Sequence, residues 1–501
     1  MIGMIILLLV VSVIGFIYRS WFTALPLTSG DWPYLFIENI KEFSWFPEIR
    51  FLWLSPYYQI LTKIVVQYVG VPWVITEKVF WFLPFIILSF FASYKLTRSM
   101  LGALIYTTNT YALMIVGGGQ MGVAMAYAIA PLVLKRFNLQ SSIFKSILIT
   151  GAIFAIQVMF DPRIAILTLV ASILYYVFKL REMPPLPMRT SIGIAALLNL
   201  YWIVPLLRSQ TSIAQQLGEA TVDSVKFLSF ATFEQTISLL HPNWPENIFG
   251  KVHFVQSEFL FLPIIAFSSL FIAKKSRTIL YFSFLALLGA FLAKGANEPF
   301  GEVYIWLFNH IPGFVLFRDP SKFYLYTALA FSVLIPLVIQ RTGKTKLLSL
   351  FFILFWLFTI REAFFGQLTG TFRPANVPQE YIKLKDFFNT QYDSFQTLWI
   401  PERQRFGFYS KLHPSIDAQL LSKQSSISGM IHWVSNEETQ RELMAMQVKY
   451  IIVPYDSRGE LFLTDRKYDE KLYLDTMDKI FTVPWLHKVD AFFRIGVFEV
   501  R

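Results

Sequence analysis

Long apolar segments alternate with short polar connections through most of the chain. A helix needs about 20 apolar residues to cross the roughly 30 Å hydrocarbon layer of a membrane, and segments near that length recur. The pattern predicts about eleven transmembrane helices. Their expected ranges are Ile2–Tyr18, Trp73–Tyr94, Ser99–Val116, Met121–Leu134, Ile147–Phe160, Ile164–Phe178, Ser191–Leu207, Phe259–Ala273, Thr278–Ala293, Phe323–Gln340 and Leu347–Phe365. Tyr57–Val71 is a weaker apolar stretch and is interpreted as an interfacial helix.

The short connections between these segments are strongly biased in charge. Every second connection is basic, and together these loops hold fourteen Lys or Arg residues against one acid, Glu182. Under the positive-inside rule these loops are cytoplasmic, as is the N-terminus. Residues 19–72, 208–258 and 294–322, and everything after Phe365, are then extracytoplasmic. The first span lacks a basic flank and a small-residue cleavage site, so we interpret it as a retained helix.

Composition agrees with an integral membrane protein, located in the cell or plasma membrane. Of the 501 residues, 55% are hydrophobic and only 15% are charged, where a soluble protein has about 25% charged residues. The basic loops account for the net charge of +11, so the charge predicts no nucleic-acid partner. The chain has no cysteine, which excludes disulfides, thiol nucleophiles and cysteine metal sites.

After Phe365 the composition becomes that of a soluble domain. The range Gly366–Arg501 holds 17 basic and 17 acidic residues, and its apolar residues come in short runs. We predict a transmembrane domain over residues 1–365 and an extracytoplasmic α/β domain over 366–501. The expected elements of the second domain are helices at Gln379–Asn389 and Glu437–Met446 and strands at Thr397–Ile400, Val448–Val453 and Phe492–Val500. No internal repeat is present, which disfavours the repeat-built transporter folds.

Charged residues beside the predicted outer ends of the helices are the main candidates for function. Asp31 lies in the turn Thr28–Pro33, just after the first span, and the other candidates are Asp161, Arg163, Arg318, Asp319 and Lys322. A structural alternative exists for each. Asp31 fits an ordinary Ser-Gly-Asp turn, and the acids at 161 and 319 fit helix-end ion pairs with Arg163 and Arg318.

In combination, these residues match the needs of one reaction. Transfer of a sugar from a polyprenyl-phosphate carrier needs a general base to take the proton of the acceptor hydroxyl. It needs no general acid, because the leaving phosphate is stable as an anion. It does need cationic donors for that phosphate, and arginine is well suited to this. Asp31 with Arg163, Arg318 and Lys322 provides these groups on the predicted outer side.

The architecture also resembles the GT-C superfamily of membrane glycosyltransferases, which combine a long first exterior loop carrying an acid, many spans and a C-terminal exterior domain. The segment Phe317–Phe323, FRDPSKF, is similar to an element before a late span in YfhO-like proteins and mycobacterial-type arabinofuranosyltransferases. The strand Val448–Val453, VKYIIV, resembles a strand in their exterior domains. The resemblance implies that Asp31 is the base and that Arg318 and Lys322 face the donor phosphate.

The chain departs from the family pattern in two places. Asp161 follows the fifth predicted span rather than the third, so Asp161, like Asp319, is either a second acid or a structural residue. The Trp-Trp-Asp signature of oligosaccharyltransferases is absent from the sequence, so sequon glycosylation is not supported.

The function predicted from the sequence is that of an inverting glycosyltransferase. Its donor is a polyprenyl-phosphate sugar in the lipid membrane, and its acceptor is an extracytoplasmic glycan or lipid. The alternative is a non-catalytic membrane protein that binds or translocates lipid-linked glycan. A secondary solute transporter is the third hypothesis. His241 and His253 are candidate neighbours of the active site. The predicted reaction needs no cofactor. A requirement for a divalent cation is left open by the sequence.

Overall fold

The computed structural model describes residues 2–28, 32–43, 56–138, 143–180, 185–208, 221–242, 255–272, 276–342, 345–365, 373–424, 426–455 and 470–501. The chain forms two compact units. The first contains Met1–Thr23, Ser44–Thr62 and Ile75–Phe372, and the second contains Ala24–Phe43, Lys63–Val74 and Arg373–Arg501. Each unit is described by itself below.

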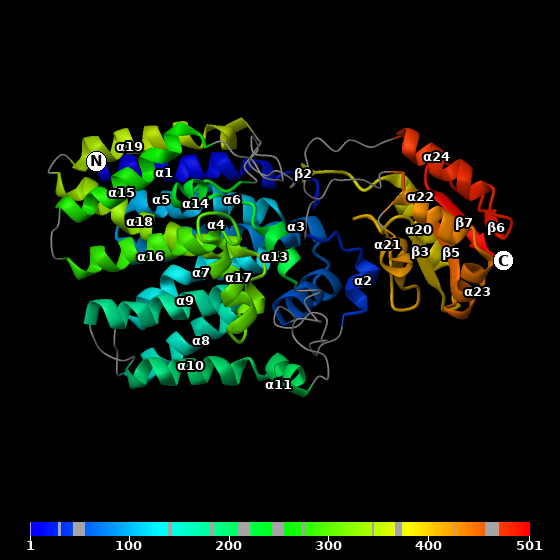
Figure 1. Ribbon diagram of the computed structural model, residues 1–501, viewed down its shortest axis with the longest axis horizontal. Helices are drawn as coiled ribbons and strands as arrows, with labels where there is room; N and C mark the ends of the chain where they lie inside the picture. The colour runs from blue at the N-terminus through cyan, green and yellow to red at the C-terminus, as the bar shows by residue number, and fades with distance from the viewer. Residues whose placement is uncertain are drawn as a thin grey trace. The chain divides into compact units, whose positions relative to one another are not determined.

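The first unit is a bundle of apolar helices whose long members run side by side (Figure 1). Its helices are α1 (Ile2–Tyr18), α4 (Leu83–Thr97), α5 (Met100–Thr108), α6 (Thr110–Gly117), α7 (Met121–Phe137), α8 (Phe144–Phe160), α9 (Pro162–Tyr175), α10 (Leu186–Leu198), α11 (Leu200–Arg208), α13 (Val222–Leu228), α14 (Phe233–Ile237), α15 (Phe261–Ile272), α16 (Arg277–Ala293), α17 (Gly301–His310), α18 (Tyr324–Arg341) and α19 (Thr345–Thr359). α18 lies at the centre of this bundle, since it packs against α4, α5, α15, α16 and α19.

Every segment expected to span the membrane is largely helical, which agrees with the predicted helical membrane class. Within the described residues, Trp73–Thr97 and Pro320–Arg341 have the length and composition to cross a membrane. The pairs α5–α6 and α10–α11 would add two more if each bent pair forms one span. Six further apolar helices are shorter. The region predicted as interfacial is also helical, over Pro56–Leu61 and Lys63–Tyr68.

Two breaks in the helical pattern have clear local causes. Asn109 ends α5 in an extended conformation, and its side chain accepts a hydrogen bond from the Ala112 amide (3.0 Å), which starts α6 at an angle of 41°. Asn199 separates α10 from α11 with a bend of 70°. In both cases an asparagine satisfies backbone groups that the interrupted helix leaves unpaired.

The second unit contains a five-stranded mixed sheet with the order β4-β3-β5-β7-β6. The strands are β3 (Gln396–Trp399), β4 (Ser415–Asp417), β5 (Val448–Val453), β6 (Leu486–Lys488) and β7 (Gly496–Val500). β3 pairs in parallel with β4 and β5, whereas β7 is antiparallel to β5 and β6. The helices are α20 (Gln379–Asn389), α21 (Ala418–Ser422), α22 (Ile427–Val434), α23 (Glu437–Ala445) and α24 (Glu470–Phe481).

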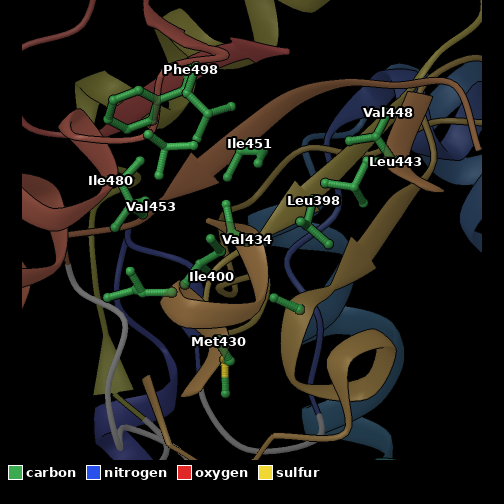
Figure 2. Packing of buried hydrophobic residues seen from close by; sticks show 14 of the residues in the cluster. Leu398, Ile400, Met430, Val434, Leu443, Val448, Ile451, Val453, Ile480 and Phe498 are labelled. Atoms are coloured by element: carbon green, nitrogen blue, oxygen red, sulfur yellow. The ribbon is translucent and has the colours of Figure 1, made fainter. Parts of the chain in front are cut away.

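Both faces of the sheet are buried at its three middle strands, because alternate residues of β3, β5 and β7 belong to different apolar clusters. Ile451 and Val453 of β5 pack with Leu398 and Phe498 and with side chains of α22 and α24 in one cluster (Figure 2). Tyr450 and Ile452, on the other face, pack with aromatic residues of α20 and its surroundings. β5 is therefore the central buried strand that its continuous apolar sequence predicts.

Four of the five elements expected in this domain lie within one or two residues of their predicted positions. The last strand differs, since it begins at Gly496 rather than at Phe492. Phe492 lies in a turn closed by a hydrogen bond from its amide to the Val489 carbonyl (3.4 Å), and its ring is buried in the second cluster. β4, β6 and α21, which are short, were not predicted from the sequence, and neither were the longer amphipathic helices α22 and α24.

Part of the first long connection belongs to the second unit. β1 (Leu27–Thr28) pairs antiparallel with β2 (Arg373–Pro374), and α2 (Ile37–Lys41) follows shortly after it. Phe36 lies in the second apolar cluster, with its ring 5.7 Å from that of Phe408. Glu38 pairs with Lys385 at 3.4 Å. A segment predicted as an exterior loop is thus part of the core of this unit.

We therefore expect Phe36→Ala to destabilise the second unit by about 3 kcal/mol, since it removes a buried aromatic ring and leaves a cavity. Phe36 is 8% exposed, whereas the adjacent Ile37 is 45% exposed, so Ile37→Ala is the matched control. Chemical unfolding of the full-length protein, followed by its tryptophan fluorescence, measures the difference. Equal stability of the two variants would contradict a core role for this segment.

Candidate functional site

Two helices of the first unit begin with the same local arrangement, an Asp-Pro pair followed by a basic residue. At the start of α9, Asp161 is the N-cap and accepts hydrogen bonds from the amides of Arg163 (2.9 Å) and Ile164 (3.2 Å). Pro162 occupies the first helical position, where a missing N–H has no cost. The Asp161 carboxylate also binds the Arg163 guanidinium, with Nη2 to Oδ2 at 2.6 Å.

The second arrangement lies in FRDPSKF, before α18. Asp319 caps the short helix Pro320–Phe323 through the Ser321 amide (2.9 Å) and forms an ion pair with Lys322. The structural alternative expected from the sequence, an ion pair between Asp319 and Arg318, is therefore wrong. The helical turn that starts at Asp319 places Lys322 beside the carboxylate instead. Burial raises the pKa of Asp319, yet Lys322 and Ser321 outweigh it and lower that pKa to about 2.

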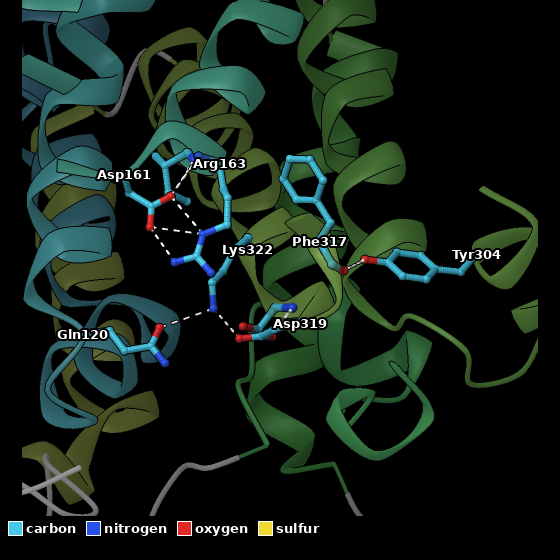
Figure 3. Close-up of polar contacts among 9 residues, drawn as sticks. Gln120, Asp161, Arg163, Tyr304, Phe317, Asp319 and Lys322 are labelled. Carbon is cyan, nitrogen blue, oxygen red and sulfur yellow. Dashed lines mark hydrogen bonds and ion pairs between the residues drawn. The ribbon is translucent and has the colours of Figure 1, made fainter. Parts of the chain in front are cut away.

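The phenylalanines of FRDPSKF hold this turn in place. The rings of Phe317 and Phe323 lie 5.2 Å apart, and both pack against Phe314. The Tyr304 hydroxyl donates a hydrogen bond to the Phe317 carbonyl at 2.5 Å (Figure 3). Gly295 packs against Pro320 in a left-handed conformation (φ 62°). A residue with a Cβ at position 295 would collide with Pro320.

Figure 3 shows the two arrangements close together, with Gln120 beside Lys322. Lys322 Nζ donates a hydrogen bond to Gln120 Oε1 at 3.3 Å, and Arg163 interacts electrostatically with Asp319. The Lys322 side chain is 2% exposed and that of Arg163 is 22% exposed. We refer to Gln120, Asp161, Arg163, Asp319 and Lys322 as the cation cluster.

The cation cluster gathers the N-terminal ends of α7, α9 and the helix leading into α18. At the starts of α9 and of the helix before α18, Asp161 and Asp319 already accept hydrogen bonds from the backbone N–H groups. Arg163 and Lys322 add two positive charges, which the two aspartates balance. The guanidinium and ammonium groups still have N–H donors that suit an anion such as a phosphate.

Gln120 was not identified as a site residue from the sequence. It follows directly after Gly117, Gly118 and Gly119 in the sequence. Gly119 has φ 83°, and the turn at this residue lets the chain reverse from α6 into α7 with Gln120 at the helix start. One sequence feature could have identified Gln120 as a site residue. It is a polar residue directly after a run of glycines, on the same predicted side of the membrane as FRDPSKF.

Arg318 is half-buried, and within the described part of the chain no acid or hydrogen-bond acceptor pairs with its guanidinium. It ends the helical turn Phe314–Phe317, four residues before Lys322. An arginine without a partner among the described residues, adjacent in sequence to Asp319 of the cation cluster, has donors for an anionic ligand. Arg208, at the end of α11, is exposed.

Asp31 lies outside the described residues, so its carboxylate is not placed here. The chain on either side of it is held in the second unit. Thr28 pairs with Arg373 across β1 and β2, and Trp32 is buried with its ring stacked 5.8 Å from that of Trp73. Trp32 is thus part of a packed core.

Of the two candidate histidines, His253 lies outside the described residues and His241 lies near the cation cluster. Its amide donates a hydrogen bond to Thr110 Oγ1 (2.7 Å), and its imidazole interacts electrostatically with Asp319 and Lys322. Burial lowers the pKa of His241 to about 4, so the ring is neutral at pH 7. No group of three or more His, Asp or Glu residues in the described ranges is arranged to hold a metal ion.

A comparison with solved structures finds proteins to which this chain is similar. Two crystal structures of the Archaeoglobus fulgidus oligosaccharyltransferase, one in the apo form and one tethered to an acceptor peptide containing the NVT sequon, match with TM-scores of 0.46 and 0.47. The sequence identities are 11% and 12%, and the matches cover 90% of this chain and 70% and 69% of the other. No family model and no curated protein matches the chain. We take no residue role from this likeness.

The first prediction for the site concerns Asp161. Asp161→Ala removes both the N-cap and the partner of a largely buried arginine, so we expect a loss of about 3 kcal/mol in the free energy of unfolding. Asp161→Asn keeps an acceptor for the backbone amides and should lose less. The double variant Asp161→Ala/Arg163→Met should recover part of the loss. Unfolding in mixed micelles measures all three, and no recovery in the double variant would contradict the ion-pair explanation.

A second prediction concerns pH. The pKa of Asp319 is lowered to about 2 in the folded protein, whereas an aspartate in the unfolded chain has a pKa of about 3.9. Its contribution to stability is therefore present above about pH 4 and is lost as the pH falls toward 2. We expect the midpoint of thermal unfolding to fall more steeply between pH 5 and 2 in the wild type than in Asp319→Asn. Parallel pH profiles would show that the pair with Lys322 does not stabilise the fold.

Proposed function

We propose that the protein is a GT-C-type glycosyltransferase that uses a polyprenyl-phosphate-linked sugar as donor and an extracytoplasmic glycan or lipid as acceptor. The observation that supports this best is the cation cluster, in which Arg163 and Lys322 converge from distant parts of the sequence. Charged side chains at the ends of apolar helices are costly and are retained mainly for function.

In this proposal the cation cluster and Arg318 bind the phosphate of the donor. Each basic residue of the cluster already has a carboxylate partner, so the site is close to neutral without ligand. A glycosyl phosphodiester carries one negative charge, and the unpaired guanidinium of Arg318 would balance it. Asp161 and Asp319 then act as structural residues that orient the cations, and Lys322 and Arg163 are donors to the phosphate oxygens.

The proposed chemical step is a single displacement with inversion at the anomeric carbon. The acceptor oxygen attacks that carbon while the bond to the phosphate oxygen breaks with its electron pair, and the polyprenyl phosphate leaves as an anion. The acceptor proton passes to the Asp31 carboxylate. Arg163, Arg318 and Lys322 stabilise the negative charge that develops on the leaving phosphate.

One observation favours the alternative, a protein that binds or translocates lipid-linked glycan without catalysis. Both carboxylates of the cation cluster are engaged in ion pairs and N-caps, so neither is free to act as a base. A binding protein would use the same cations and would have no need of Asp31. The two functions therefore differ in the requirement for that carboxylate.

The test is turnover of a panel of radiolabelled polyprenyl-phosphate pentoses and hexoses by the purified protein. Asp31→Asn should lower transfer by about 10²-fold or more while donor binding persists, because only proton removal is lost. Arg318→Ala should weaken donor binding by about 10-fold or more, the value of a charge-assisted hydrogen bond.

Matched controls are Asp223→Asn and Arg341→Ala, both at exposed positions of the first unit. Neither change should alter transfer or binding. Full transfer by Asp31→Asn would eliminate this carboxylate as the base. Donor binding without transfer of any sugar, unaffected by Asp31→Asn, would favour the non-catalytic binder.

A further inference from the structure

A tyrosine hydroxyl beside the cation cluster lacks a protein partner. Tyr111 lies in the first turn of α6, directly after the break at Asn109, and its side chain is fully buried. Its hydroxyl has no hydrogen-bond partner among the described residues. Leaving a buried hydroxyl unpaired costs about 1–3 kcal/mol, so such a group calls for an explanation.

The hydroxyls of the neighbouring tyrosines, unlike that of Tyr111, have hydrogen-bond partners within the fold. The hydroxyls of Tyr106 and Tyr127 donate to each other's backbone carbonyls at 2.7 and 2.8 Å, and that of Tyr324 donates to the Leu240 carbonyl at 2.9 Å. The Tyr111 ring stacks on Tyr324, with centroids 5.5 Å apart and planes at 8°. Packing alone therefore fixes the Tyr111 ring, and its hydroxyl contributes nothing to that packing.

Tyr111 is connected to the cation cluster through the start of α18, because its ring stacks on that of Tyr324, two residues after Lys322. The charges of Asp319, Asp161 and Arg163 also act on its hydroxyl. The hydroxyl forms a hydrogen bond to neither carboxylate. The positive charges of Arg163 and Lys322 favour an anionic acceptor for it.

We propose that the Tyr111 hydroxyl donates a hydrogen bond to a phosphate oxygen of the lipid-linked donor bound by Arg163 and Lys322. This inference rests on the proposed function and adds a neutral donor to its phosphate site. A hydroxyl suits this place because it adds no charge to a cluster in which each cation is already paired. In the absence of donor the hydroxyl stays unpaired or binds water.

The experiment measures binding of polyprenyl phosphate, which lacks a sugar, to the full-length protein in nanodiscs. Tyr111→Phe removes only the hydroxyl, so we expect binding to weaken about 10-fold. The thermal unfolding midpoint should stay equal or rise, since no protein hydrogen bond is lost. Binding of uncharged polyprenol should not change, because it carries no phosphate.

Tyr324→Phe is the matched control, since it removes a neighbouring hydroxyl that is satisfied within the fold. This change should lower the unfolding midpoint and leave polyprenyl phosphate binding unchanged. Wild-type affinity in Tyr111→Phe would overturn the inference, as would an equal loss of affinity for polyprenol, which would indicate a packing effect.

Two further variants separate this inference from the proposed function. If Arg163→Gln and Lys322→Gln weaken polyprenyl phosphate binding but Tyr111→Phe does not, only the role of Tyr111 is wrong. If none of the three changes affects binding, or the wild type does not bind the probe, the phosphate site of the proposed function is wrong as well.

Discussion

The structure of the candidate site depends on one constraint, that a charge at the end of an apolar helix must be paired. The chain meets it twice in the same way. An aspartate caps the helix, a proline starts it, and a basic residue of the first turn returns to the cap, as Arg163 does to Asp161 and Lys322 to Asp319. Each pair is local and offsets the desolvation of its own charges. The two pairs could therefore be placed together with the charges of each pair balanced.

Aromatic packing turns these local pairs into a fixed site. Phe317, Phe323 and Tyr304 hold the turn before α18, and the stack of Tyr111 on Tyr324 links the start of α6 to that of α18. The segment around His241 is anchored to the same two helices, because Thr110 and Tyr324 bond its backbone. Groups held this firmly lose little entropy when a ligand binds, which is the basis of preorganised anion recognition.

The second unit contains the described residues on either side of the candidate base Asp31. Its mixed sheet is buried on both faces, and one of those faces is completed by Phe36 from the first long connection. The residues before and after Asp31 belong to this unit through the pairing of β1 with β2 and the stacking of Trp32 on Trp73. The C-terminal sheet therefore folds together with Thr28 and Trp32, the described residues that flank the candidate base.

The sequence by itself determined the helical segments, the membrane class and most elements of the C-terminal sheet, because apolar length and periodicity are local properties of the chain. It also singled out Asp161, Arg163, Asp319 and Lys322, since charges beside hydrocarbon are rare. Only the tertiary structure decided that Asp319 pairs with Lys322 rather than Arg318, that Gln120 completes the cluster, and that the Tyr111 hydroxyl is left without a protein partner. These features arise from helix starts that are far apart in the sequence, and no local pattern specifies which of them meet.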